Sequence, residues 1–84
     1  MTNELHSFYN ASPGDIIQDS LDALRWDEKN LADITGLSDK LIDKLVNNKQ
    51  QITPEIAKLL SSAFSTSAEI WLNLDARYQM RKLE

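Results

Sequence analysis

Apolar residues recur along this chain every three or four positions, which is the spacing of one face of an α-helix. No stretch shows the strict alternation of apolar and polar residues that a half-buried strand needs. The pattern therefore predicts an all-α protein built from five short helices. Each predicted helix follows a serine, threonine or aspartate that can cap its first turn. These capping residues are Ser12, Asp27, Ser38, Thr53 and Ser67.

Further residues mark where the predicted helices start and stop. Pro13 suits the first position of a helix, and Asp15 completes a capping box with the serine before it. Gly36 accepts a positive φ and is expected to end the second helix. The pair Asn47-Asn48 is expected to leave the third helix through a left-handed conformation, which asparagine tolerates.

The residues expected to face the core share one stripe of each helix. In the first four helices they are Ile16, Ile17, Leu21, Leu24, Leu31, Ala32, Leu41, Ile42, Leu45, Val46, Ile56, Ala57, Leu59, Leu60, Ala63 and Phe64. The opposite face of the first helix carries Asp15, Asp19 and Asp22 at helical spacing. Such an acidic stripe is either simply solvated or a surface that meets a basic partner protein.

The segment from about 27 to 47 meets the physical requirements of a helix-turn-helix. Two helices that cross through a tight turn need a small side chain where they touch, and Ala32 provides it. Gly36 supplies the turn four residues later, and Ile42 and Leu45 are spaced to point back at the first helix. Small helical bundles can satisfy this spacing by chance, so the pattern alone leaves both interpretations open.

If the third helix is a recognition helix, its outer face meets base edges and phosphates of double-stranded DNA. That face consists of Ser38, Asp39, Lys40, Asp43, Lys44 and Asn47. Lys29 and Lys49 flank it and are candidates for phosphate contacts. Together with Glu28, the charged positions are four lysines against three acids, a net of +1. The electrostatic attraction of one subunit for DNA would be weak, and a dimer would double the contacts.

The fifth helix, predicted from about 67 to 82, carries two apolar stripes. One stripe can cover the core and contains Ile70, Trp71, Leu74 and Tyr78. The second is turned well away from the first and contains Leu72, Ala76 and Met80. A second stripe would stay exposed in a monomer, so it is a candidate dimer interface. The alternative is a wide core-facing surface in a small bundle.

The composition narrows the classes of function. The chain has 84 residues, which predicts one small domain. It has no cysteine and a single histidine, His6, so thiolate and histidine-rich metal sites are excluded and no cofactor is expected. The sequence contains no glycine-rich phosphate loop, and its paired carboxylates are surface acids without a visible cleft, so we do not expect an enzyme.

The N-terminal residues and the overall hydropathy bear on location. Residues 1–11 are expected to form a flexible arm, and they have neither the basic start nor the apolar stretch of a signal peptide. No apolar run approaches the roughly 20 residues that span a membrane. We therefore expect a cytoplasmic protein without membrane contacts.

The net charge of −4 is distributed unevenly. Residues 1–35 hold seven acidic and two basic side chains, whereas residues 36–84 hold six acidic and seven basic ones. Overall acidity argues against non-specific binding of nucleic acid but leaves room for a local basic surface. The asymmetry fits either two surfaces for different partners or plain solubility.

Three spaced motifs resemble those of the HigA-type, or VapI-type, antitoxins of the Xre/Cro-like helix-turn-helix group. Pro13-Gly14, Thr53-Pro54-Glu55 and Trp71-Leu72-Asn73-Leu74 occupy the places of the family's motifs, and the match covers about residues 12–80. The resemblance implies a five-helix, lambda-repressor-like domain over residues 12–82 that forms a homodimer. It also implies neutralisation of a HigB-type ribonuclease toxin and repression of the shared operon through an operator inverted repeat.

The chain departs from the family pattern where DNA contacts are expected. Asp27-Glu28 stand where the family often has Ser-Gln, and a glutamate would repel the phosphate that the glutamine contacts. Asp39 follows the cap of the third helix, where a basic or neutral residue is common. The Asn-Gly-Lys exit becomes Asn47-Asn48-Lys49, which keeps the turn chemistry and the lysine. Two hypotheses follow: an autorepressing antitoxin, or an Xre-like regulator or protein-interaction module with weak or no DNA binding.

Overall fold

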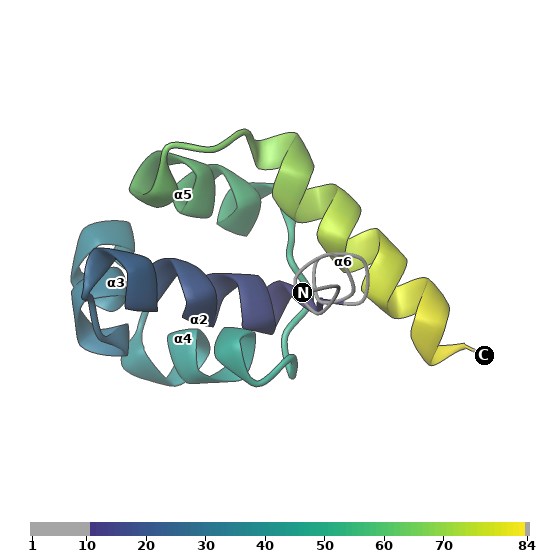
Figure 1. Ribbon diagram of the computed structural model, residues 1–84, viewed down its shortest axis with the longest axis horizontal. Coiled ribbons are helices and arrows are strands. Elements are labelled where there is room, and N and C mark those ends of the chain that lie inside the picture. Colours follow the sequence, from purple (N-terminus) through teal and green to yellow (C-terminus); the bar gives the residue numbers. More distant parts are fainter. Residues whose placement is uncertain (1–10, 84) are drawn as a thin grey trace, which may run out of the picture.

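The computed structural model describes residues 11–83, and within that range the chain forms five α-helices and no strand (Figure 1). The helices are α2 (Pro13–Leu24), α3 (Glu28–Thr35), α4 (Asp39–Val46), α5 (Pro54–Phe64) and α6 (Ala68–Lys82). This confirms the predicted all-α, five-helix fold. The proposed flexible arm, apart from Ala11, and His6 lie outside the described residues.

All five predicted capping residues begin a helix. The side chain of each accepts a hydrogen bond from the backbone N–H three residues later. In α2 the Asp15 carboxylate also accepts from the backbone N–H of Ser12 at 3.3 Å, which completes the predicted capping box. Local chemistry therefore determines where these short helices start.

The five helices enclose one apolar core. α2 packs against α4 and α6, α3 packs against α4 and α5, and α5 packs against α6. The buried apolar residues are Ile17, Leu21, Leu31, Ala32, Ile42, Leu45, Ile52, Ile56, Ala57, Leu60 and Trp71. Trp71 is the largest of them, and its indole Nε1 donates to the Thr66 hydroxyl at 2.8 Å. A buried indole N–H is therefore satisfied by the loop between α5 and α6.

The helical pattern assigned some apolar residues wrongly. Leu24 and Ile70 were expected to face the core, but they are 45% and 48% exposed. Leu24 is the last residue of α2, so no further helical turn covers it, and Ile70 lies about 100° around α6 from the buried Trp71. Conversely, Ile52 and Trp26 pack in or against the core from the connections, where no helical period marks them.

The start of α2 lies against the exit of α4. The Gly14 N–H donates to the side-chain oxygen of Asn48 at 2.9 Å, and the Asn48 amide donates to the Ser12 hydroxyl at 2.8 Å. A Cβ at Gly14 would collide with the Val46 carbonyl oxygen and lie 2.9 Å from Asn48 Oδ1. Asn48 itself has a φ of 60°, the left-handed exit that the sequence predicted. The Pro-Gly motif thus permits a close approach of two helices.

Candidate DNA-binding surface

α3, α4 and the turn between them form a helix-turn-helix. Gly36 has a φ of 81°, and its N–H donates to the Ala32 carbonyl at 2.8 Å, which ends α3 as predicted. The buried Thr35 hydroxyl donates to the Leu31 carbonyl at 2.8 Å and accepts from the Leu37 N–H at 3.2 Å. Hydrogen bonds therefore hold the turn on both sides of the glycine.

The inner face of α4 anchors this helix to the rest of the domain. Ile42 and Leu45 are fully or almost fully buried, and Ala32 of α3 is buried beside them in the core. These are the positions that the helix-turn-helix spacing predicted. The outer face of α4 is thereby directed away from the core.

The predicted DNA contacts are all exposed. They are Lys29 on α3, Ser38, Asp39, Lys40, Asp43, Lys44 and Asn47 on and beside α4, and Lys49 after it. All eight side chains therefore face solvent, and their contact with DNA stays a prediction.

The exposed face of α4 is divided by charge. Successive residues of an α-helix are about 100° apart, so residues four positions apart lie almost in line. Asp39 and Asp43 therefore form one edge of the face, Lys40 and Lys44 form the other, and Asn47 follows between them. The exposed face therefore consists of an acidic strip beside a basic strip. The net charge of the helix does not show this division.

Two of the predicted contact residues already serve α4 itself. The Ser38 hydroxyl accepts from the Leu41 N–H at 3.1 Å as the helix cap. The Asn47 side-chain amide donates to the Asp43 carbonyl at 2.8 Å and to the Asp43 carboxylate at 3.2 Å. Sequence reasoning missed the second contact, although its four-residue spacing is a known signal for side-chain pairs on helices.

The position of Asp39 also has a local explanation. It lies in the first turn of α4, and Lys44 lies in the last turn. Negative charge near a helix N-terminus and positive charge near its C-terminus are both favourable to the helix dipole. Asp39 therefore stabilises α4 whatever it does toward a ligand.

The acidic stripe on α2 is exposed along its length. Asp15, Asp19 and Asp22 all face solvent, as predicted. Asp15 belongs to the capping box, and the Asp22 carboxylate accepts from the Gln18 side-chain amide at 3.0 Å. Two of the three aspartates thus make hydrogen bonds within α2, and any contact with a partner would be additional.

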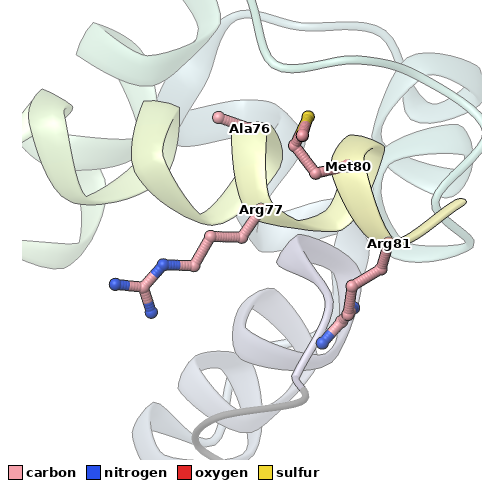
Figure 2. A pocket seen from close by; sticks show the side chains of 4 residues that line it. All are labelled: Ala76, Arg77, Met80 and Arg81. Carbon is pink, nitrogen blue, oxygen red and sulfur yellow. The ribbon is translucent and has the colours of Figure 1, made fainter. Parts of the chain in front are cut away.

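The proposed dimer stripe on α6 is only partly exposed. Met80 is 64% exposed and Ala76 is exposed, but Leu72 is partly buried and packs against the core. The C-terminal end of α6 extends beyond the other helices (Figure 1). A shallow, mostly apolar hollow lies against this end, lined by Ala76, Arg77, Met80 and Arg81 (Figure 2).

Two further properties of residues 11–83 concern membranes and metal ions. None of the helices in this range is long and apolar enough to cross a membrane. The same residues contain no group of three or more histidine, cysteine, aspartate or glutamate side chains arranged to hold a metal ion.

The five-helix fold with an exposed α4 defines a helix-turn-helix protein, and sequence comparison identifies the family. No protein-family model matches the chain. The uncharacterised HTH-type transcriptional regulator YddM of Escherichia coli K12 is 35% identical over 72 residues, which cover 86% of this chain and 77% of YddM. The chain therefore belongs to the Xre-like family of HTH-type transcriptional regulators.

Solved structures with the same fold include antitoxins. A putative antidote protein of a plasmid maintenance system from Nostoc punctiforme has a TM-score of 0.80 and 34% identity, over 84% of this chain and 78% of the antidote protein. The Pseudomonas aeruginosa antitoxin HigA, solved with the higBA promoter, has a TM-score of 0.81 and 27% identity, over 86% of this chain and 79% of HigA. These relatives are regulators and antitoxins, in keeping with a role other than catalysis.

Proposed function

We propose that this protein is the antitoxin of a type II toxin–antitoxin system, which represses its own operon and neutralises a HigB-type ribonuclease toxin. The observation that carries the proposal is the exposed polar face of α4, held outward by a helix-turn-helix, in a chain with the fold of a HigA solved with promoter DNA. In this proposal α4 enters the major groove, where Lys40 and Lys44 meet guanine edges or phosphates. Lys29 and Lys49 hold the flanking phosphates.

The proposed regulator is a homodimer of domains spanning residues 12–82. One subunit presents a charge of only +1 over its DNA-facing surface, and two subunits on paired half-sites double the phosphate contacts. Ala76 and Met80 form the centre of the proposed interface, because both are exposed in the second half of α6, whose end projects beyond the other helices. Leu72 contributes only its accessible part.

The decisive experiment is a gel shift with DNA from upstream of the protein's own gene, with and without the product of the neighbouring gene. A random duplex of the same length and base composition is the control. We expect binding at least about tenfold tighter to the upstream DNA, with an affinity that falls steeply as salt rises. Equal affinity for the two duplexes would refute the repressor half of the proposal.

The acidic stripe of α2 is the proposed surface for the toxin, because acidic and basic surfaces steer each other's encounter. The test replaces Asp19 and Asp22 by asparagine and keeps Asp15, whose carboxylate closes the capping box. The matched control, Asp33→Asn with Glu69→Gln, removes two other exposed acids. We expect weaker capture of the neighbouring gene product by the α2 variant alone, and equal capture by both variants would remove this role for the stripe.

A second candidate function is a protein-interaction module that binds DNA weakly or not at all. It is favoured by the two aspartates that stand beside the two lysines on the exposed face of α4. The gel shift separates the candidates. Under the second, the protein still captures the neighbouring gene product, but its affinity for the upstream DNA equals that for the random duplex.

A further inference from the structure

The contact between Asp43 and Asn47 orients a side-chain amide at the C-terminal end of the exposed face of α4. Asn47 Nδ2 lies 2.8 Å from the Asp43 carbonyl oxygen and 3.2 Å from Asp43 Oδ1. A carbonyl and a carboxylate only accept hydrogen bonds, so the NH₂ group of the amide must face them. The opposite orientation would place three oxygens together.

This orientation limits what Asn47 offers to a ligand. The NH₂ group has two N–H bonds, and Asp43 offers its nitrogen the same number of acceptors, the backbone carbonyl and the carboxylate. An asparagine that reads adenine uses its oxygen and one N–H together, at N6 and N7 of the base. With its donors engaged, Asn47 presents its oxygen alone, which can accept from cytosine N4 or adenine N6 but leaves adenine N7 without a donor.

The charges beside Asn47 on α4 fit a C·G base pair. In the major groove cytosine offers only its N4 amino donor, whereas guanine offers only acceptors. The strip formed by Asp39, Asp43 and the Asn47 oxygen accepts, and the strip formed by Lys40 and Lys44 donates. A C·G pair presents a donor edge and an acceptor edge side by side, in the same way as the two strips.

We propose that Asp43 is a positioning residue that determines specificity: by holding the Asn47 amide, it makes Asn47 select cytosine rather than adenine in the operator. The inference rests on the proposed DNA binding and names the base that one position of α4 prefers. Asp43 acts through Asn47, and its removal frees one N–H for the paired contact with adenine.

The test selects sequences from a random duplex pool with the wild type and three variants. Asp43→Ala removes a charge and the carboxylate acceptor of the contact, Asp39→Ala removes a charge alone, and Asp43→Asn removes a charge but keeps an acceptor oxygen. Both substituted positions are exposed on a helix, so the three variants are expected to fold. All three should bind DNA more tightly than the wild type, because each loses one negative charge.

Base preference separates the variants. We expect the ratio of adenine to cytosine at one position of each half-site to rise by about tenfold in Asp43→Ala and to stay unchanged in Asp39→Ala and Asp43→Asn. The same motif from Asp43→Ala and Asp39→Ala would overturn the inference while leaving DNA binding intact. No enriched motif for the wild type or any variant would overturn the repressor half of the proposed function and this inference with it.

The side-chain amide can also be observed without DNA. In ¹⁵N-correlated NMR spectra, Asp43→Ala should shift the two Nδ2 proton resonances of Asn47, because it removes the carboxylate acceptor of one of them. Asp39→Ala, which lies on the same strip, should leave them in place. Unchanged Asn47 amide resonances in Asp43→Ala would show that Asp43 does not hold the amide, and would overturn the inference independently of any DNA binding.

Discussion

Gly14 lies in the first turn of α2, where alanine is ordinarily the better helix former. Here the space for a methyl group is taken by the Val46 carbonyl at the end of α4. Asn48 completes the contact from the other side: it adopts a positive φ and bonds to both Gly14 and Ser12. Two residues 34 positions apart thus hold the exit of α4 against the start of α2.

Gly14→Ala is expected to destabilise the protein, although the substitution favours isolated helices. The added Cβ forces α2 and α4 apart, and overpacking of this kind costs about 1–3 kcal/mol in the free energy of unfolding. Urea unfolding followed by tryptophan fluorescence measures the change. A variant as stable as the wild type would contradict the close approach, and Ser20→Ala, farther along α2, serves as a control for helix propensity.

Two substitutions separate the contribution of the Asn48 side-chain hydrogen bonds from that of its backbone conformation. Asn48→Gly keeps the positive φ at no steric cost but loses both side-chain hydrogen bonds, so we expect a loss of about 1–2 kcal/mol in unfolding free energy. Asn48→Ala loses the same bonds and also strains the backbone, so it should cost roughly 1 kcal/mol more. Equal stabilities of the two variants in urea would argue against the left-handed conformation at this position.

Pairs of helices are joined by particular side chains rather than by the periodic pattern alone. The α5–α6 connection turns at Ser65, with a φ of 58°, and Thr66 then accepts from the Trp71 indole. Phe64 lies between Trp26 and Trp71, with ring centroids 5.9 and 5.8 Å away. This cluster joins α5, α6 and the α2–α3 connection on one side of the core.

Thr66→Ala should weaken this junction, because it leaves the Trp71 N–H without its protein acceptor. We expect a loss of about 1 kcal/mol in the free energy of unfolding. Thr66→Ser keeps the hydroxyl and removes only a methyl group from an exposed residue, so it should be close to neutral. Urea titrations of both variants test the difference, and a serine variant as unstable as the alanine variant would show that the hydrogen bond is not the cause.

The basic strip of α4 makes its own prediction. Replacing Lys40 and Lys44 by alanine should weaken binding to the upstream DNA and reduce the slope of log affinity against log salt by about one per lost phosphate contact. Lys58→Ala with Lys82→Ala removes two exposed lysines elsewhere and should change the slope little. Salt titrations of both double variants measure this, and equal slopes would exclude α4 as the DNA-facing element.

The molecule as a whole leaves the end of α6 uncovered. The first half of α6 packs on the core through Trp71 and Leu74, whereas its end projects past the other helices with Met80 exposed (Figure 1). A large apolar side chain at a projecting helix end favours contact with another surface. In a symmetric dimer the same side chain is buried twice.

Met80→Gln should weaken the proposed dimer. Burial of a methionine contributes about 1.5–3 kcal/mol, and two copies per interface should raise the dimer dissociation constant by about a hundredfold or more. Leu24→Gln changes another exposed apolar residue at the end of α2 and should leave the constant unchanged. Sedimentation equilibrium measures both, and a wild type that stays monomeric at high concentration would rule the interface out.

The predictable part of the structure is the part set by neighbours in sequence. All five helix starts follow from a capping side chain that bonds three residues ahead, and the helix-turn-helix follows from Ala32, Gly36 and the apolar spacing of α4. The side chains of α4 that were predicted to face DNA are exposed because they lie on the face opposite that spacing. The pattern assigned Leu24, Ile70 and Leu72 less accurately. The helical spacing of apolar residues shows which of them share a face, but it does not show how far the neighbouring helix extends.

The sequence alone determined the number and starts of the helices, most of their inner faces and the segment that forms the helix-turn-helix, since these depend on contacts within a few residues. Tertiary structure decided why Gly14 must lack a side chain, which half of α6 is covered, and how Trp26 and Ile52 reach the core. Those features depend on distances between segments far apart in the chain. The Asp43–Asn47 contact lies between the two: its spacing is visible in the sequence, but only the folded helix shows that both donors of the amide are engaged.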